Sequence, residues 1–533
     1  MRFDSVIIGG GSAGCVVAGR LSEDPARRVC LLEAGPENSD PRIQIPVGVV
    51  AVMGHPRFDW RFQSAPHRHL ADRRVPVPRG KTLGGSGSIN SMVYIRGRAS
   101  DYDGWAAAGC TGWDWESVLP WFKRAENNRE LGEDDLHGND GPLHVQDLPS
   151  PHPMIRNYIS AGAALDIPYN RDFNGVAQLG LGNYQTTMND GTRFSPADAY
   201  LAPIRSQKNI EVITDCLVDR IEFEGRRAVT IHARRGNQSL RIDVDGEVIT
   251  SAGAIGSPAV LMRSGVGPAE HLRGLGIKPL VELDGVGENL HDHPAFGVHY
   301  AGGKQGYALS LTTALENLAA PFRYLLSRKG LLSSNTVEGG GFACTRDGLA
   351  EPDVQFHFIP ARVGHEGSML TWGRGYYSDV CLLKPESRGR LKLASRDPQA
   401  APDIDLNLLA TAEDRAVFLR GVKLLRRLLA HPDLTGGDAI EVMPGESVQT
   451  DEELMDVIGT RLGTAYHPVG TCRMGSSDDP RAVVDAELRV IGLENVSVAD
   501  ASIMPEIVAG NTNAPSMMIG EVAADRIRRR HGK

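Results

Sequence analysis

The sequence predicts a mixed α/β (α+β) fold in which a discontinuous Rossmann-like domain is interrupted by a second domain built on an antiparallel sheet. The chain opens with an apolar run, a glycine-rich turn, a helical stretch and a second apolar run, which is the order of a β-α-β unit. A strand and helix of the same type recur near the C-terminus, and the pattern changes after about residue 295. The length of 533 residues also exceeds what one hydrophobic core usually serves.

The composition is that of a globular protein and excludes several classes. Hydrophobic residues make up 41% of the chain. The formal net charge of −9 argues against nucleic-acid binding, because that function requires a clustered cationic surface. The seven cysteines are widely spaced and form no CxxC pair, so we expect no metal site and a reduced, cytoplasmic setting. The first strand begins almost at Met1, which leaves no room for a signal peptide, and no window holds the roughly 20 apolar residues of a membrane span. Any attachment to a membrane is therefore expected to be peripheral.

The first turn has the sequence of a dinucleotide-binding motif. A strand at residues 6–8 precedes it and a helix over residues 13–22 follows, which is the context that G-x-G-x-x-G requires. The three glycines permit the tight turn, the approach of a pyrophosphate and the packing of helix on strand, while the helix N-terminus supplies free N–H groups. After the second strand, at 29–32, a carboxylate can accept hydrogen bonds from a ribose. The expected contacts are Gly9, Gly11, Ser12, Ala13, Gly14, Glu33 and Ala34.

The remaining elements divide the chain into two domains. Apolar runs predict strands at 211–214, 217–223, 228–233 and 247–250, followed by a helix over 257–264. Strands at 354–359 and 390–393 and a helix over 412–429 predict the second domain, and a strand at 494–500 with a helix over 514–529 returns to the first. Residues 102–195 are expected to be irregular because they are rich in Gly, Pro, Asp and Trp. We expect a nucleotide-binding domain of residues 1–150, 196–296 and 461–533, and a substrate-binding domain of residues 151–195 and 297–460.

Two longer stretches carry a resemblance to a known family. Residues 80–90, Gly-Lys-Thr-Leu-Gly-Gly-Ser-Gly-Ser-Ile-Asn, and residues 253–267, which begin Gly-Ala-Ile-Gly-Ser-Pro, resemble the two signature regions of the glucose-methanol-choline oxidoreductases. With the first turn and the segments at 466–468 and 511–513, the resemblance covers nearly the whole chain in order. The glycine turn by itself suits FAD and NAD equally, because both contain ADP. The resemblance implies FAD, and it points to the choline dehydrogenase-like branch.

The resemblance also implies a set of FAD contacts. Residues 84–90 resemble the loop over the pyrophosphate and flavin, where small residues let the backbone approach closely. Some choline oxidases attach the flavin through a histidine just before the asparagine of this loop; Ile89 stands there in this chain, so we expect a non-covalent flavin. Val218 resembles the position that holds adenine by its main chain, although an ordinary strand valine would look the same. The implied contacts are Leu83, Gly84, Gly85, Asn90, Ser91, Val93, Val218, Asp500 and Ala501.

His467 and Asn511 resemble the catalytic pair of the family. An alcohol gives up hydride easily only as it loses its hydroxyl proton, so a base must lie within about 2.6–3.2 Å of that oxygen. A histidine suits this task at neutral pH, whereas an asparagine can only hydrogen-bond the same oxygen. The choline-type members carry asparagine at the second position. Asn511 could alternatively cap the helix that follows, although Asn513 is better placed for capping.

Four residues are candidates for the substrate side. Glu338 resembles a carboxylate that pairs with the quaternary ammonium in choline-oxidising relatives, and His357 resembles a second histidine of the pocket. Trp60 and Tyr466 could offer aromatic faces to a cation. Relatives that act on polyols also have a glutamate in such a segment, so the substrate is expected to be choline or another primary alcohol.

The expected reaction is oxidation of an alcohol by hydride transfer to flavin N5. Without a second dinucleotide turn, the electrons must pass to oxygen, a quinone or another carrier, and Ala465 favours a dehydrogenase over an oxidase. A homodimer is compatible with the resemblance. The alternatives are a hydroxynitrile lyase, a fatty-acid photodecarboxylase, a polyol or sugar dehydrogenase, and a flavin-binding protein without catalysis.

Overall fold

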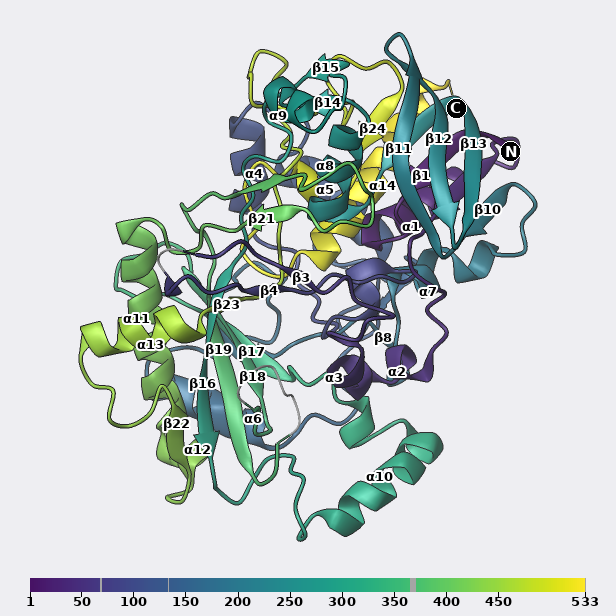
Figure 1. Cartoon of the computed structure of the whole chain (residues 1–533). Coiled ribbons are helices and arrows are strands. Elements are labelled where there is room, and N and C mark those ends of the chain that lie inside the picture. Colours follow the sequence, from purple (N-terminus) through teal and green to yellow (C-terminus); the bar gives the residue numbers. More distant parts are fainter. Residues whose placement is uncertain (68–69, 133, 365–370, 533) are drawn as a thin grey trace.

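Two seven-stranded sheets organise the chain in a computed structural model that describes residues 1–67, 70–132, 134–364 and 371–532 (Figure 1). The first sheet has the order β10-β2-β1-β13-β12-β11, with β24 paired to β13. Its strands are β1 (Arg2–Ile8), β2 (Val29–Leu32), β10 (Ile210–Ile213), β11 (Cys216–Glu224), β12 (Arg227–Arg235), β13 (Gln238–Thr250) and β24 (Val496–Val498). Strands β1, β2, β10, β24 and the end of β13 run parallel, whereas β11, β12 and the start of β13 form an antiparallel meander.

The parallel part of this sheet is buried on both faces. Val6 and Ile7 are fully buried in β1, and all four residues of β2 are buried. Such strands read as continuous apolar runs because helices cover both faces. Helix α1 (Ser12–Leu21) packs against α14 (Asn513–Arg530), so the two ends of the chain lie together at the top of Figure 1. The predicted Rossmann-like β-α-β unit is therefore present.

The second sheet is antiparallel and has the order β22-β16-β19-β18-β17-β7, with β23 paired to β16. Its strands are β7 (Gly180–Asn183), β16 (Pro294–Ala301), β17 (Gly339–Ala343), β18 (Val354–Ile359), β19 (Gly375–Leu382), β22 (Ile440–Met443) and β23 (Gly463–Thr464). Helix α11 (Ala412–Leu429) packs on it through Phe418, Val422 and Leu425, which are fully buried. The mixed fold class is thus confirmed. The domain limits stay a prediction, because β16 crosses the expected border at 296/297 and β23 lies beyond 461.

Several elements differ from those expected. The stretch 102–195 is not irregular: it contains the end of α4 (Ala99–Ala107), all of α5 (Trp115–Ala125) and α6 (Met154–Ala163). The Asp114 side chain caps α5 and Pro120 lies inside it, so proline and aspartate, taken as signs of loops, belong to a helix here. Helix α8 (Gly253–Arg263) begins earlier than expected, and β20 (Arg390–Lys392) forms a two-stranded sheet with β21 (Asp403–Asp405).

The connections between the sheets carry the residues of interest. His293 directly precedes β16, and His467 follows β23 after two residues. Asn511 lies two residues before α14, whose N-cap position is Thr512, so neither Asn511 nor Asn513 caps this helix. The basic residues 528–530 form its last turn, where their charge complements the helix dipole. In the part of the chain that the structure describes, no helix is long and apolar enough to cross a bilayer.

Candidate active site

The first glycine turn is shaped for a close approach by a ligand. A Cβ atom on Gly14 would lie 1.9 Å from the carbonyl oxygen of Gly9, and one on Gly9, where φ is +102°, would lie 2.6 Å from that of Ser251. A Cβ on Gly11, by contrast, has no neighbour nearer than 3.7 Å. Gly11 is the N-cap residue of α1, and no side chain caps the helix. The turn therefore combines packed outer glycines with open space and free N–H groups at its centre.

The second glycine loop lies directly on this turn. The N–H of Gly84 donates to the carbonyl of Gly10 at 2.7 Å, and a Cβ on Gly85 would lie 2.7 Å from the Cα of Gly11. Both loop glycines are left-handed, with φ of +83° and +55°. A side chain on Gly85 would push the loop off the turn, so the two motifs act as one structure.

Glu33 closes the turn from the sheet side. Its Oε2 atom accepts from the N–H of Gly10 at 2.9 Å, and its Oε1 atom accepts from the N–H of Gly35 at 2.7 Å. Burial raises the pKa of this carboxyl to about 7, against the hydrogen bonds that favour its charged form. The carboxylate thus holds the turn in shape, and its contact with a ribose stays a prediction.

The other expected FAD contacts lie in several elements. Asp500 follows β24, where its Oδ2 atom accepts from the N–H of Gly253 at 2.8 Å and from the Ser257 hydroxyl at 2.5 Å, which ties the strand to α8. Ser12 donates to the Oδ1 atom of Asn513 at 2.7 Å. Val218 lies in β11 and Val93 in a buried bridge to Thr186. Six of the expected contacts are partly exposed to solvent although most of their neighbours are buried: Gly11, Ser12, Ala34, Asn90, Ser91 and Ala501.

These observations test whether the residues fit FAD. A diphosphate needs open backbone N–H groups at a helix N-terminus, and the space at Gly11 provides them. The partly exposed residues of the second loop lie beside it. The residues present therefore fit the cofactor that the resemblance implies.

His467 and Asn511 form a pair, as the sequence predicts. The Nδ2 atom of Asn511 lies 3.2 Å from the Nε2 atom of His467. Gln355, in β18, donates from its Nε2 atom to the Oδ1 atom of Asn511 at 3.1 Å. Because this bond occupies the amide oxygen, the amide N–H of Asn511 is left to face the histidine. The Nε2 atom of His467 therefore accepts, and it carries no proton.

His293 leads to the same assignment from the other side of the ring. Its Nε2 atom lies 3.1 Å from the carbonyl oxygens of both Leu383 and Val508, so this nitrogen must carry the proton and donate. Its Nδ1 atom is then an acceptor and lies 3.0 Å from the Nδ1 atom of His467. His467 therefore donates from Nδ1 and keeps the lone pair on Nε2. The hydrogen bonds from Asn511 and from His293 therefore indicate the same tautomer of His467, with the proton on Nδ1.

The segment 291–293 also ties together the backbones that carry the pair. The Oδ1 atom of Asp292 accepts from the main-chain N–H of His467 at 2.7 Å, and the Nε2 atom of His291 accepts from the N–H of Ile507 at 2.8 Å. Sequence reasoning missed these residues. The signal available was the run His-Asp-His-Pro at 291–294, three polar, titratable residues directly before an apolar strand.

Burial sets the charge of this network. Burial and the neighbouring His293, His357 and Arg79 lower the pKa of His467 well below its ordinary value, and burial lowers that of His293 to about 3. Both rings are therefore neutral at physiological pH. Burial raises the pKa of Asp292 to about 6, although Arg79 and the hydrogen bond from His467 partly offset this effect.

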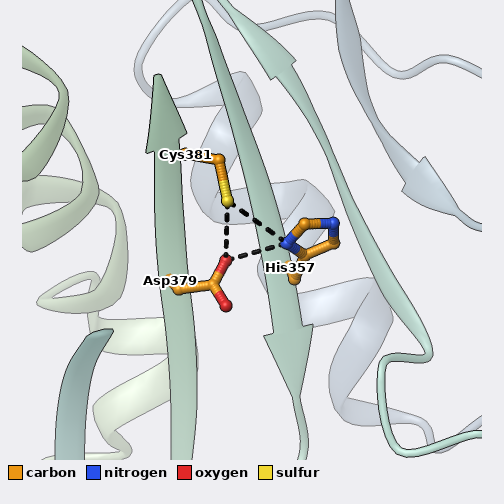
Figure 2. A group of neighbouring side chains, drawn as sticks. All are labelled: His357, Asp379 and Cys381. Carbon is orange, nitrogen blue, oxygen red and sulfur yellow. Dashed lines mark hydrogen bonds and ion pairs between the residues drawn. The ribbon is translucent and has the colours of Figure 1, made fainter. Parts of the chain in front are cut away.

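His357, on β18, lies in a cluster with Asp379 and Cys381, which are on the neighbouring strand β19 (Figure 2). Its Nδ1 atom lies 2.8 Å from the Oδ1 atom of Asp379, and the Cys381 sulfur lies 3.7 Å and 3.6 Å from these two atoms. Burial and the neighbouring Asp379 raise the pKa of the Cys381 thiol well above its ordinary value, so the thiol is protonated in this cluster. The Nε2 atom of His357 is buried without a hydrogen-bond partner. His357 follows Gln355 by two residues and shares its face of β18, and its contact with a substrate stays a prediction.

The three remaining substrate candidates have partners within the chain. The Oε1 atom of Glu338 accepts from the Ser334 hydroxyl and its Oε2 atom from the N–H of His152, both at 2.5 Å, and the side chain is fully buried. Trp60 stacks on Phe62, and the ammonium of Lys81 lies 4.8 Å from its ring centroid. Tyr466 precedes His467 in a left-handed conformation with φ of +66°. Their role in substrate binding stays a prediction.

The comparisons with known proteins define the class. The family models described as GMC oxidoreductase match residues 3–295 with their N-terminal part and residues 385–520 with their C-terminal part. The chain belongs to the GMC (glucose-methanol-choline) oxidoreductase family. It is an FAD-dependent oxidoreductase that acts on CH–OH groups.

Relatives cover the chain from end to end. It is 43% identical to an alcohol dehydrogenase (acceptor) of Pseudomonas putida and 41% identical to an oxygen-dependent choline dehydrogenase of Sinorhizobium fredii, in each case over 99% of this chain and 96% of the relative. The crystal structure of pyridoxine 4-oxidase from Mesorbium loti matches with a TM-score of 0.89 at 33% identity, over 100% of this chain and 99% of that chain.

Proposed function

We propose that this protein oxidises a primary alcohol, with His467 as the base and Asn511 as the group that positions the hydroxyl oxygen. The observation that carries the proposal is the hydrogen-bond network around His467, from which we infer an unprotonated Nε2 atom 3.2 Å from the amide nitrogen of Asn511. This nitrogen accepts the hydroxyl proton while the amide N–H donates to the same oxygen. The lowered pKa of His467 supports the role, because the ring is neutral before substrate arrives.

When bound, FAD supplies the acceptor for the hydride at its N5 atom. The chain's own contribution is to hold the diphosphate at Gly11 and the N-terminus of α1 and to cover it with the loop at Gly84 and Gly85. Ile89 packs with Ile43, Val52 and Phe58 in a small apolar cluster. This side chain offers no nucleophile, which supports a non-covalent flavin.

The substrate we favour is an alcohol without a cationic group. Glu338 is fully buried and burial raises its pKa, while its oxygens accept from Ser334 and His152, so this carboxyl group is enclosed within the chain and is not presented as a charge to an ammonium. An apolar pocket lies beside β18, lined in part by Val47, Val50, Leu331 and Ile359. Choline remains the second candidate, supported by the relative from Sinorhizobium fredii. The two are separated by which alcohol reduces the flavin.

We infer that the electrons leave through an external acceptor, since the described chain has a single dinucleotide turn. The names of the relatives support either a separate carrier or oxygen in this role. All seven cysteines are free, which supports a reducing, cytoplasmic setting.

The test is an anaerobic titration of the purified yellow protein with a panel of alcohols, followed by flavin absorbance. We expect uncharged primary alcohols to bleach the flavin and His467→Ala to lower the limiting rate by ~10²–10⁴-fold. Turnover with a cyanohydrin or with light, while every alcohol leaves the flavin oxidised, would contradict the proposal.

A further inference from the structure

Helix α10 (Ala314–Ser327) presents an unpartnered apolar face to the outside. It lies at the lower edge of the molecule, apart from both sheets (Figure 1). Six large apolar side chains on or just before the helix are between 69% and 88% exposed. We call them the α10 face: Leu311, Leu315, Leu318, Phe322, Leu325 and Leu326.

The orientation of this face is fixed by the opposite side of the helix. The five members of the α10 face within the helix are spaced so that they lie on one stripe, and Leu311 precedes the helix. Ala320 and Tyr324 are buried on the other side, where the Tyr324 hydroxyl donates to the carbonyl of Gly191 at 3.1 Å. Turning the leucines inward would break this anchor, so the apolar stripe points away from the protein.

Basic side chains lie near the α10 face. Arg323, Arg328 and Lys329 are exposed on the helix or just after it, and Glu316 is the one acidic residue between residues 311 and 330. This local excess of positive charge contrasts with the net charge of −9 for the whole chain. An amphipathic helix with leucines, a phenylalanine and flanking basic residues is the composition that lies in the interface of an anionic bilayer. We propose that the α10 face docks this protein on an anionic phospholipid membrane.

The exposed apolar surface extends beyond α10 to Leu309 and Trp372. Leu309 and Trp372 are bridged to each other and are 39% and 64% exposed. Tryptophan is favoured at the level of lipid headgroups. Leu309 also lines the apolar pocket beside β18, together with Tyr307 and Leu331 on either side of α10 in the chain. The proposed membrane surface therefore borders this apolar pocket.

A second copy of the chain fits this face less well. A symmetric dimer about α10 would join two surfaces of the same net positive charge, because each copy has three cations and one acidic residue between residues 311 and 330, and like charges across an interface are unfavourable. Anionic lipid headgroups neutralise them instead. The proposal concerns binding to lipid, so it stands or falls independently of the alcohol that the enzyme oxidises.

The test is flotation of the purified holoenzyme with large unilamellar vesicles of phosphatidylcholine alone or mixed with phosphatidylglycerol. We expect the enzyme to float with the anionic vesicles and to remain unbound with the neutral ones. The triple variant Leu315→Gln, Leu318→Gln, Phe322→Gln removes exposed apolar groups only, and we expect it to lower the bound fraction at least about tenfold. Arg323→Glu with Lys329→Glu is expected to weaken binding to anionic vesicles specifically.

The matched control is Val176→Gln, because Val176 is 99% exposed and lies outside the α10 face. This variant should float like the unmodified enzyme, and all variants should keep FAD and its reduction by a water-miscible alcohol. The proposal is overturned if the unmodified enzyme ignores anionic vesicles or if the triple variant binds them equally well. Light scattering of the unmodified enzyme and the triple variant tests the alternative occupant. If the unmodified enzyme is a dimer that does not bind vesicles and the triple variant is a monomer, the α10 face binds a second copy of the chain.

Discussion

The Nδ1 atoms of His293 and His467 lie 3.0 Å apart, and the proton between them belongs to His467. His293 cannot supply it, because its own proton on Nε2 is held by two carbonyl groups. His293 thus acts through another residue: it positions His467 and selects the tautomer that leaves Nε2 free. The effect of a triad carboxylate on its histidine is comparable, since loss of the tautomer there costs orders of magnitude in rate.

Replacement of His293 should slow the reductive half-reaction without loss of FAD. His293→Ala removes the acceptor and leaves His467 free to carry its proton on Nε2, so we expect the limiting rate to fall by ~10–10²-fold. His293→Asn offers an amide oxygen near the position of Nδ1 and should recover part of the rate. Stopped-flow reduction and the flavin-to-protein absorbance ratio measure both effects. Equal rates in the two variants would argue against control of the tautomer.

Removal of Asn511 should have a smaller effect than removal of His467. Asn511→Ala deletes one hydrogen bond to the alcohol oxygen, which is worth about 1.5–3 kcal/mol when charge develops, or ~10–150-fold in rate. The loss should appear in the limiting rate rather than in the apparent Kd of the alcohol. Gln355→Ala, which frees the amide of Asn511 to rotate, should show a weaker loss of the same kind.

The rate of flavin reduction should not fall as the pH is lowered through 6.5. His467 is active when neutral, and its pKa is lowered, so activity should stay constant as pH falls through 6.5 and decline only at lower pH. A free histidine would instead lose activity around pH 6.5. Rapid-reaction measurements across the acid range test this expectation, and an acid limb centred at 6.5 would contradict it.

The buried His293 should make the fold less stable in acid. Its folded pKa of about 3 lies below the unfolded value near 6.5, so between these values the unfolded chain binds more protons. Stability from this group is present above pH 6.5 and falls by about 1.4 kcal/mol per pH unit below it. Asp292 and Glu33 act in the opposite sense, because their pKa values are raised to about 6 and about 7. The difference in slope between the unmodified enzyme and His293→Asn, from urea unfolding at several pH values, isolates His293.

A side chain on the second glycine loop should prevent flavin binding. Gly85→Ala adds a Cβ atom 2.7 Å from the Cα of Gly11 at a left-handed φ of +55°, so the loop must leave the dinucleotide turn. We expect a colourless, folded protein. Gly104→Ala is the matched control, because nothing lies within 4 Å of its Cβ position in α4 and the helix favours alanine. This variant should remain yellow.

Glu338 should matter for stability rather than for choice of substrate. Glu338→Gln replaces one acceptor oxygen by an amide N–H group facing the existing donors Ser334 and His152, which should cost about 1–3 kcal/mol. Thermal unfolding measures this loss. The preference between choline and an uncharged alcohol should not change, whereas a selective loss of choline oxidation would restore the ammonium-binding role.

The nucleotide-binding half could be predicted closely because its signals are local. The strand, turn and helix around Gly9–Gly14 are contiguous, and the pattern of burial in β1 and β2 follows from their apolar runs. The short helices between residues 102 and 195 could not be predicted in the same way. In α5 the proline and the capping aspartate resemble loop signals, and only packing against α4 and α14 makes the segment helical.

The sequence by itself determined the family and the cofactor and predicted His467 and Asn511 as the catalytic pair, since these inferences depend on short motifs with fixed neighbours. The tertiary structure decided which nitrogen of His467 is free. Gln355, His293 and the carbonyls of Leu383 and Val508 come from four distant segments, and a tautomer is selected only when their hydrogen bonds converge on one ring. The outward direction of the α10 face was decided there too, because the same spacing of leucines serves a buried helix until its neighbours are placed.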